Sequence, residues 1–209
     1  MKNAVVYAAT TEGIDDGALE KALSMLPLWR REYVEKKITP EKINGAFSYL
    51  LLQLLLEKEF AATDTAPFTY GKQGKPFFSK QDLFFSMSHC KTAVGAAVCE
   101  YEIGLDLMDS RKINENLAAR ICSIDELKSF ELSEDKQLFL RQIWCKKESA
   151  VKMTGSGFTK GFRNVDTTKL HFSFFENADY IMSVYMNKAN CNVTTKEIDW
   201  KTLIYNDIL

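Results

Sequence analysis

The feature that most constrains the fold is a long, largely apolar stretch that begins at Thr39-Pro40. Threonine offers a capping hydroxyl, and proline is tolerated in the first turn of a helix, where its missing N–H does no harm. The apolar positions that follow recur with helical spacing: Ile43, Phe47, Leu50, Leu51, Leu54 and Leu55. Because this stripe is wide, the pattern predicts a buried core helix that ends near Phe60.

Predicted strands lie on both sides of this helix in the sequence. Residues 3–9 are apolar and β-branched, and similar stretches follow at about 82–87, 93–99 and 103–108. Asp15 or Asp16 can cap a short helix that runs to about Leu26, before Pro27. Residues 61–80 contain two prolines and two glycines and predict an exposed loop.

The second half of the chain repeats this mixture of helices and strands. Ser123 and Glu126 form a capping box, and Ser133 can cap a longer helix that stops at Gly155. Strand-like stretches follow near 169–176, 179–186 and 191–197, with a hairpin turn over 176–179. The order predicts an α+β fold with two halves, residues 1–102 and 103–209, and a site at their junction.

The composition excludes several classes of protein. With 27 basic and 28 acidic residues the net charge is −1, which argues against a nucleic-acid-binding face and requires any anion site to be local. The five cysteines include no CxxC pair, so they predict free thiols rather than a zinc or redox centre. The most apolar run, residues 49–56, is far too short to span a membrane. We expect a cytoplasmic protein with no membrane segment.

Two polar clusters in the first half have both a functional and a structural interpretation. The loop from Gly71 to Pro76 contains two glycines and two lysines, which suit an anion, although a solvated turn has the same composition. Residues 86–90, Ser-Met-Ser-His-Cys, follow an apolar strand. His89 can donate to a phosphate from either ring nitrogen, but a lone histidine more often has a structural role.

A carboxylate interrupts the apolar strand at residues 103–108. Leu105 and Leu107 point to one face of this strand, whereas Asp106 and Met108 point to the other. Burying the Asp106 carboxylate is costly unless it is paired, hydrogen-bonded or bound to a metal.

A fourth cluster lies on the long helix near residues 144–157. Trp144, Glu148 and Lys152 share one helix face, and Glu148 with Lys152 would also make an ordinary surface ion pair. From Arg141 to Arg163 there are six basic residues and one acidic residue, which predicts a local anion-binding patch.

Together these clusters resemble the 4'-phosphopantetheinyl transferases of the Sfp type. That family's blocks run GKP, an SHS-like turn, GxDxE and WxxKEAxxKxxGxG. The corresponding blocks here occur in the same order: GKPFF at 74–78, FSMSHC at 85–90, GLDLM at 104–108 and WCKKESAVKMTGSG at 144–157. The last block matches at Trp144, Lys147, Glu148, Lys152, Gly155 and Gly157. Ser149 stands in the family's usual alanine position, and the alanine, Ala150, comes one place later.

The resemblance implies a fold, an activity and a catalytic set. Such enzymes are monomers built as a pseudodimer of two similar α+β halves, and they move the phosphopantetheine arm of coenzyme A onto a serine of an acyl or peptidyl carrier protein. Adenosine 3',5'-bisphosphate is released. Asp106 and Glu148 would hold Mg²⁺, and Glu148 would accept the serine proton directly or through a water. Lys152 would neutralise charge on the pyrophosphate.

The resemblance also implies a coenzyme-binding set. Lys75, Pro76, Ser88 and His89 would lie along coenzyme A, with Lys75 and His89 near its phosphates. Since carrier proteins are generally acidic, the patch from Arg141 to Arg163 would be their docking surface. No nucleic acid or membrane partner is expected.

Two departures from the family pattern leave alternatives open. Met108 replaces the glutamate of GxDxE, and a thioether is a poor ligand for Mg²⁺, so a water would fill that position. The residue for the 3'-phosphate of the coenzyme is not assigned, because residues 44–52 are uncharged. A non-catalytic protein that binds coenzyme A or a carrier protein, and an unrelated α+β protein whose motifs coincide, are the alternatives to an active transferase.

Overall fold

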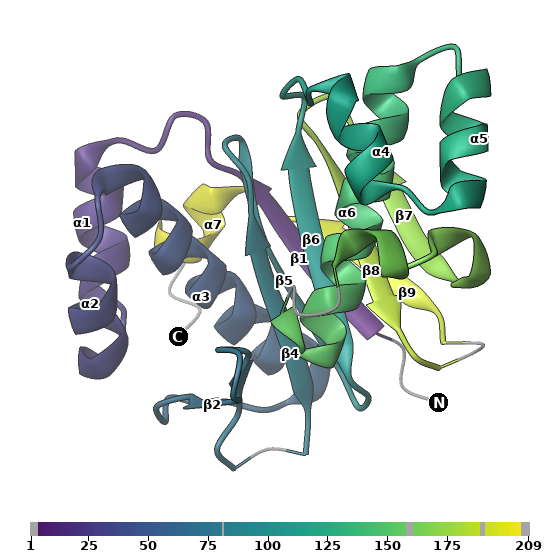
Figure 1. Cartoon of the computed structure of the whole chain (residues 1–209). Helices are drawn as coiled ribbons and strands as arrows, with labels where there is room; N and C mark the ends of the chain where they lie inside the picture. Colours follow the sequence, from purple (N-terminus) through teal and green to yellow (C-terminus); the bar gives the residue numbers. More distant parts are fainter. Residues whose placement is uncertain (1–3, 81, 158–160, 189–190, 206–209) are drawn as a thin grey trace.

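Two β-sheets lie face to face at the centre of the molecule, and helices cover the outer face of each (Figure 1). This computed structural model describes residues 4–80, 82–157, 161–188 and 191–205. Small side chains, including Ala4, Ala8, Ala93 and Ala97, fill much of the layer between the sheets. Their small volume lets the two sheets approach closely. The structure confirms the α+β class.

The first sheet has four strands in the order β4-β5-β1-β9. Strand β5 is antiparallel to both β4 and β1, whereas β9, the last strand of the chain, is parallel to β1. The bounds of the strands are β1 Ala4–Thr10, β4 Phe84–His89, β5 Ala93–Cys99 and β9 Val193–Glu197. Segments nearly 190 residues apart in the sequence thus lie side by side in this sheet.

The second sheet has three antiparallel strands in the order β6-β8-β7. They are β6 Ile103–Asp109, β7 Phe172–Glu176 and β8 Tyr180–Met186. In both sheets the first strand is followed by helices and then by a hairpin whose second strand lies beside the first strand, as β1-β5-β4 and β6-β8-β7. A separate small hairpin joins β2, Thr69–Tyr70, to β3, Pro76–Phe77.

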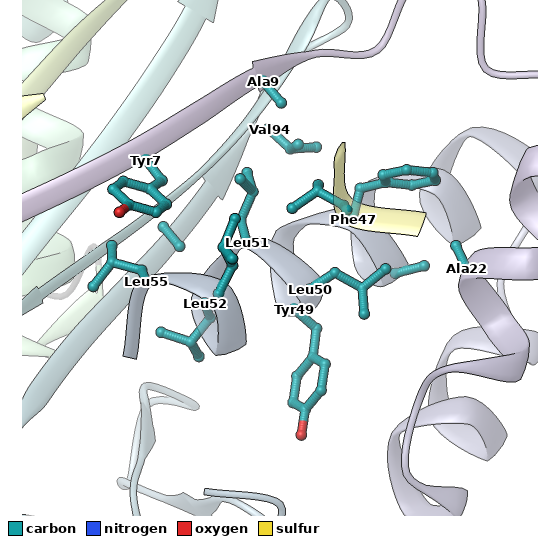
Figure 2. Packing of buried hydrophobic residues seen from close by; sticks show 14 of the residues in the cluster. Tyr7, Ala9, Ala22, Phe47, Tyr49, Leu50, Leu51, Leu52, Leu55 and Val94 are labelled. Carbon is teal, nitrogen blue, oxygen red and sulfur yellow. The ribbon is translucent and has the colours of Figure 1, made fainter. Parts of the chain in front are cut away.

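Four helices cover the first sheet: α1 Asp16–Ser24, α2 Leu28–Glu35, α3 Thr39–Phe60 and α7 Trp200–Tyr205. The predicted bounds of α3 are confirmed, and every residue from Ala46 to Leu56 is buried. Figure 2 shows Leu51 and Leu55 of α3 beside Tyr7 and Val94 of the sheet. The wide apolar stripe is therefore explained by contacts on several sides of the helix.

The helices of the second half are α4 Ala118–Ile121, α5 Ile124–Leu132 and α6 Lys136–Thr154, with short 3₁₀ turns at Glu115–Leu117, Phe162–Asn164 and Thr167–Lys169. Helix α6 lies against β6, and Gly104 is where the two backbones meet. A Cβ at Gly104 would lie 1.9 Å from the carbonyl oxygen of Ser149. Glycine is therefore required there by close approach, not by its backbone angles.

Several sequence predictions of local structure are confirmed and two caps are wrong. The capping box of α5 and the stop of α6 at Gly155 (φ 60°) are as expected. However, Thr39 lies inside α3, whose N-cap Ile38 makes no side-chain capping bond. Ser133 ends α5, and Asp135 caps α6 by accepting a hydrogen bond from a backbone N–H. Asp135 lies next to the first residue of the helix, where a carboxylate also interacts well with the helix dipole.

The helices and the cysteines bear on two predictions from composition. Within the described ranges, no helix has the length and apolarity needed to cross a bilayer. The cysteines are free, and four of them are buried.

Candidate active site

The two sheets are joined where their edge strands β4 and β6 meet. The hydroxyl of Ser86 accepts a hydrogen bond from the N–H of Leu105 (3.0 Å), and the hydroxyl of Ser88 accepts one from Leu107 (3.1 Å). An edge strand presents unpaired N–H groups that need acceptors when they are buried. The two serine hydroxyls therefore accept the hydrogen bonds that the carbonyl groups of a neighbouring strand would otherwise accept. This contact between β4 and β6 is here called the seam.

Asp106 forms an ion pair at the seam. Its Oδ1 lies 2.6 Å from Nζ of Lys152 on α6, and Ser88 donates a hydrogen bond to the same oxygen (3.1 Å). The side chain of Asp106 is 9% exposed and that of Lys152 is 33% exposed. Asp106 and Met108 face α6 while Leu105 and Leu107 face the layer between the sheets, as the strand pattern predicted. The buried carboxylate is thus paired and hydrogen-bonded.

Glu148 lies one helical turn before Lys152 and is half-buried. The pKa of its carboxyl is raised to about 7, chiefly by burial and then by the negative charge of Asp106, while the positive charge of Lys152 partly offsets both effects. A carboxyl group with a pKa near neutrality can accept a proton and release it again at neutral pH. Glu148 is therefore suited to general base catalysis.

A cavity of about 330 Å³, here called the seam cavity, lies between the two halves. The α6 side of its wall includes Glu148, Val151 and Lys152. Residues 73–75 of the loop between β2 and β3 and Pro76, the first residue of β3, also line it. Gly155 and Gly157 close the cavity beyond the end of α6.

A second cavity, of about 450 Å³, lies between the first sheet and helices α2 and α3 and is here called the N-terminal cavity. Its lining includes the cationic side chains Arg30 and Lys37 together with His89. Three residues line both cavities, so the two cavities adjoin: Gly74, Pro76 and Met87. Each cavity is in the size range of small-molecule sites.

Arg30 is the main candidate residue that the sequence interpretation did not assign to the site. It is 6% exposed, and its Nη2 donates to the carbonyl of Gly45 (2.8 Å). Its guanidinium lies 5.3 Å from the ring centroid of Tyr33, while its Nε is buried without a hydrogen-bond partner. An unpaired buried donor on a cation is costly unless a ligand satisfies it. The sequence does contain a signal for the helix that carries Arg30. Arg30 and Val34 are four residues apart, between Pro27 and Thr39, so they share one face of a short helix.

His89 is the last residue of β4 and reaches the N-terminal cavity. The protein atoms around the imidazole lower its pKa, and the positive charge of Lys152 lowers it further. The ring is therefore largely neutral at pH 7 until an anion binds beside it.

The amine of Lys75 is turned toward the end of α6. It donates to the carbonyl of Met153 (2.6 Å) and lies 3.4 Å from the carbonyl oxygen of Ile103. A Cβ at Gly155 would lie 3.1 Å from Cδ of Lys75. Lys75 thus fastens the β2–β3 loop to the end of α6, and its expected place beside a coenzyme phosphate stays a prediction.

The predicted basic patch is smaller than the sequence indicated. The side chain of Lys147 has no exposed area and pairs with Glu126 (2.6 Å), so it is wrong to count it as a surface charge. Lys152 pairs with Asp106 inside the site, and Lys160 lies outside the described residues. Buried and paired cations contribute little to a docking surface.

Two carboxylates of the site could serve as ligands of a divalent cation. Asp106 and Glu148 offer carboxylate oxygens from β6 and α6, whereas Met108 is buried among apolar side chains such as Leu140 and Ile143. The described residues include no group of three or more His, Cys, Asp or Glu side chains that could hold a metal ion. Mg²⁺ commonly takes one or two carboxylates and completes its shell with phosphate oxygens and waters, so the two carboxylates fit this ion when a phosphate-containing substrate is present.

Comparison with known protein families finds one similarity that agrees with the fold and the site. Residues 102–201 match the model of the 4'-phosphopantetheinyl transferase superfamily. The second half of the chain is therefore similar to this superfamily.

Individual proteins are also similar to this chain over part of their length. The chain is 27% identical to 4'-phosphopantetheinyl transferase psf-1 of Bacillus pumilus over 129 residues, which is 60% of this chain and 53% of that protein. It is also 27% identical to the L-aminoadipate-semialdehyde dehydrogenase-phosphopantetheinyl transferase of Candida glabrata over 167 residues, which is 74% of this chain and 64% of that protein. The chain thus spans less than two thirds of the length of either relative.

One solved structure has a looser likeness. The crystal structure of Thermotoga maritima holo-[acyl-carrier-protein] synthase matches with a TM-score of 0.35 and 17% identity, over 42% of this chain and 64% of that one. A likeness at this level supports no inference about function.

Proposed function

We propose that this protein is a phosphopantetheinyl transferase of the Sfp type that moves the 4'-phosphopantetheine arm of coenzyme A to a serine of an acyl or peptidyl carrier protein. Adenosine 3',5'-bisphosphate is the second product. The observation that carries the proposal is the seam cavity, where Glu148, with a pKa near 7, lies beside the Asp106–Lys152 pair. The match of residues 102–201 to the 4'-phosphopantetheinyl transferase superfamily model supports it.

The proposed architecture is a monomeric pseudodimer of residues 1–102 and 103–209. The shared strand order of the two sheets supports a repeated unit. Strand β9 and helix α7 are additions of the second half that pack on the first. The site then lies at the junction of the two units, along β4 and β6.

The proposed place of coenzyme A is the pair of adjoining cavities. A nucleotide with a 3'-phosphate suits the N-terminal cavity, because Arg30 and His89 offer donors and Lys37 adds a positive charge. The pyrophosphate would then reach the seam cavity past Pro76, near Lys152. This arrangement proposes Arg30 as a partner of the 3'-phosphate.

The proposed metal ligands are Asp106 and Glu148. When bound, Mg²⁺ supplies charge neutralisation to the pyrophosphate oxygens. Lys152 adds a second positive charge that is most useful as the bisphosphate leaves.

The proposed proton acceptor is Glu148. The attacking serine hydroxyl of the carrier protein gives its proton to this carboxylate, directly or through a water, as the new P–O bond forms. The bond between phosphorus and the bridging oxygen of the pyrophosphate breaks, and that oxygen leaves with the adenosine bisphosphate.

The test is a transfer assay with an apo carrier protein, coenzyme A and Mg²⁺, read by mass spectrometry. The expected result is a gain of about 340 Da, the mass of the phosphopantetheine moved by phosphoryl transfer. A carrier protein whose acceptor serine is replaced by alanine is the negative control. Glu148→Gln should abolish the gain, whereas Glu131→Gln, at an exposed position on α5, should not.

Two other outcomes have defined meanings. Binding of coenzyme A without a mass gain on a panel of acyl and peptidyl carrier proteins would support the non-catalytic alternative. Neither binding nor transfer would overturn the proposed function.

A further inference from the structure

We infer that Ser88 is a positioning residue that holds Asp106 and Lys152 in place, and that its hydroxyl is not a contact of coenzyme A. The inference rests on the proposed function and deepens it. It differs from the expectation drawn from the family resemblance, in which Ser88 lies along the coenzyme.

The first argument is the capacity of the hydroxyl group. A serine hydroxyl has one proton to donate and two lone pairs to accept with. The Ser88 oxygen accepts from the N–H of Leu107 (3.1 Å) and from Nζ of Lys152 (2.8 Å), and it donates to Oδ1 of Asp106 (3.1 Å). Ser88 forms part of the wall of the N-terminal cavity but is only 6% exposed. A phosphate oxygen needs a donor, and the single proton of Ser88 is already used.

The second argument is what these bonds hold together. Ser88 belongs to β4, Asp106 to β6 and Lys152 to α6. In the part of the chain that the structure describes, the hydrogen bonds that the Asp106 carboxylate accepts from side chains both arrive at Oδ1. This fixes the rotation of the carboxylate, while the ammonium of Lys152 is held between Oδ1 (2.6 Å) and the Ser88 hydroxyl (2.8 Å). One hydroxyl therefore sets the geometry of two charged groups from two other elements.

The chain contains a matched control two residues earlier. Ser86 lies on the same face of β4, is equally buried at 6% exposure, and accepts from the N–H of Leu105 (3.0 Å). Its hydroxyl takes no part in the bonds among Ser88, Asp106 and Lys152. Both serines join the sheets, but only Ser88 orients the charged pair.

The experiment compares Ser88→Ala, Ser86→Ala and Ser88→Thr in four measurements: thermal midpoint, affinity for coenzyme A without metal, affinity for Mn²⁺, and steady-state kinetics. Both alanine variants should lower the thermal midpoint by similar amounts, because each removes one bond between the sheets. Ser88→Ala alone should lower kcat, by about ten- to a hundredfold, since small displacements of reacting groups have effects of this size. It should also weaken Mn²⁺ binding severalfold and leave the affinity for coenzyme A within about twofold. Ser88→Thr keeps the hydroxyl and should restore most of kcat.

Distinct results would overturn the inference. A loss of coenzyme affinity of about tenfold in Ser88→Ala, with kcat preserved, would make Ser88 a coenzyme contact worth a charge-assisted hydrogen bond. Equal effects of Ser86→Ala and Ser88→Ala on Mn²⁺ binding and kcat would reduce both serines to links between the sheets.

The test also separates this inference from the proposed function. If the wild-type protein transfers nothing, the proposed function fails, and binding of Mn²⁺ and coenzyme A still decides the role of Ser88. If Ser88→Ala does not fold, Ser88→Cys replaces it, because a thiol keeps the volume and donates only weakly. Reduced Mn²⁺ affinity with unchanged coenzyme affinity then supports the positioning role.

Discussion

Replacing Glu148 by glutamine should remove activity and stabilise the protein at the same time. The folded protein raises the pKa of this carboxyl from 4.5 to about 7, chiefly because burial disfavours its charge. Ionising Glu148 at pH 8 therefore costs folding free energy that a neutral amide does not. The full shift corresponds to about 3 kcal/mol, and solvent screening at this half-buried side chain reduces it to about 1–2 kcal/mol.

The dependence on pH gives the sign of the effect. Below about pH 4.5 the carboxyl is protonated in both the folded and the unfolded state, so the charge contributes nothing to the difference between wild type and variant. Between pH 4.5 and 7 the unfolded state is ionised while the folded state holds its proton, and wild-type stability falls as the pH rises. Above pH 7 the difference in unfolding free energy between Glu148→Gln and wild type reaches its full value, with the variant more stable.

The assay is urea unfolding of wild type and Glu148→Gln from pH 4 to pH 9, with a chelator present so that no divalent cation binds. The two proteins should be nearly equal at pH 4 after correction for any constant offset. The variant should be more stable by about 1–2 kcal/mol at pH 8, which is roughly 2–8 °C in thermal midpoint for a chain of this size. A difference that is constant over the whole range would refute the raised pKa, and with it the argument for Glu148 as a base near neutral pH.

Three further predictions concern packing around the site. Gly104→Ala should destabilise the protein by about 3 kcal/mol or more, because the added Cβ would overlap the backbone of α6. In the same unfolding assay the control Gly17→Ala, near the start of α1, should be neutral or slightly stabilising. Met108→Glu should lower the thermal midpoint and add no metal affinity, because it buries a carboxylate in an apolar cluster; tighter Mn²⁺ binding would contradict this. Lys147→Met should cost about 3–5 kcal/mol by leaving Glu126 unpaired, and the double variant with Glu126→Gln should recover part of that loss, as a double-mutant cycle would show.

The elements that could be predicted from sequence are those with strong periodicity. Helix α3 and strand β6 were found with nearly correct bounds because their apolar residues repeat at 3.6 and 2 residues over several turns or pleats. Helices α2 and α7 were missed because they are short, with 8 and 6 residues, and are stabilised by packing rather than by their own sequences. The pairing of β9 with β1 joins opposite ends of the chain, and no local pattern encodes such a contact.

The candidate site, like the fold, has features that could be predicted from the sequence and features that could not. The strand period places Asp106 on the face of β6 opposite Leu105 and Leu107, and the helix period places Glu148 and Lys152 on one face of α6. In the structure Glu148 and Lys152 both line the seam cavity, and Lys152 forms an ion pair with Asp106. The partners of Lys75 and Ser88 could not be predicted, because they include backbone carbonyl and amide groups, which every residue carries. Only the tertiary structure specifies which of them a side chain reaches.

The parallel pairing of β9 with β1 has a consequence for how the chain folds during its synthesis. The first sheet gains its outer strand only when residues 193–197 have been made, and Lys196 then pairs with Glu59 of α3 (2.5 Å). Trp200 follows and packs against Phe47, with its indole N–H donating to the carbonyl of Glu12 (3.0 Å). The β1 edge and part of the α3 surface therefore stay uncovered until residues 193–200 have left the ribosome. Such late, long-range closure slows folding and exposes an edge to other chains meanwhile.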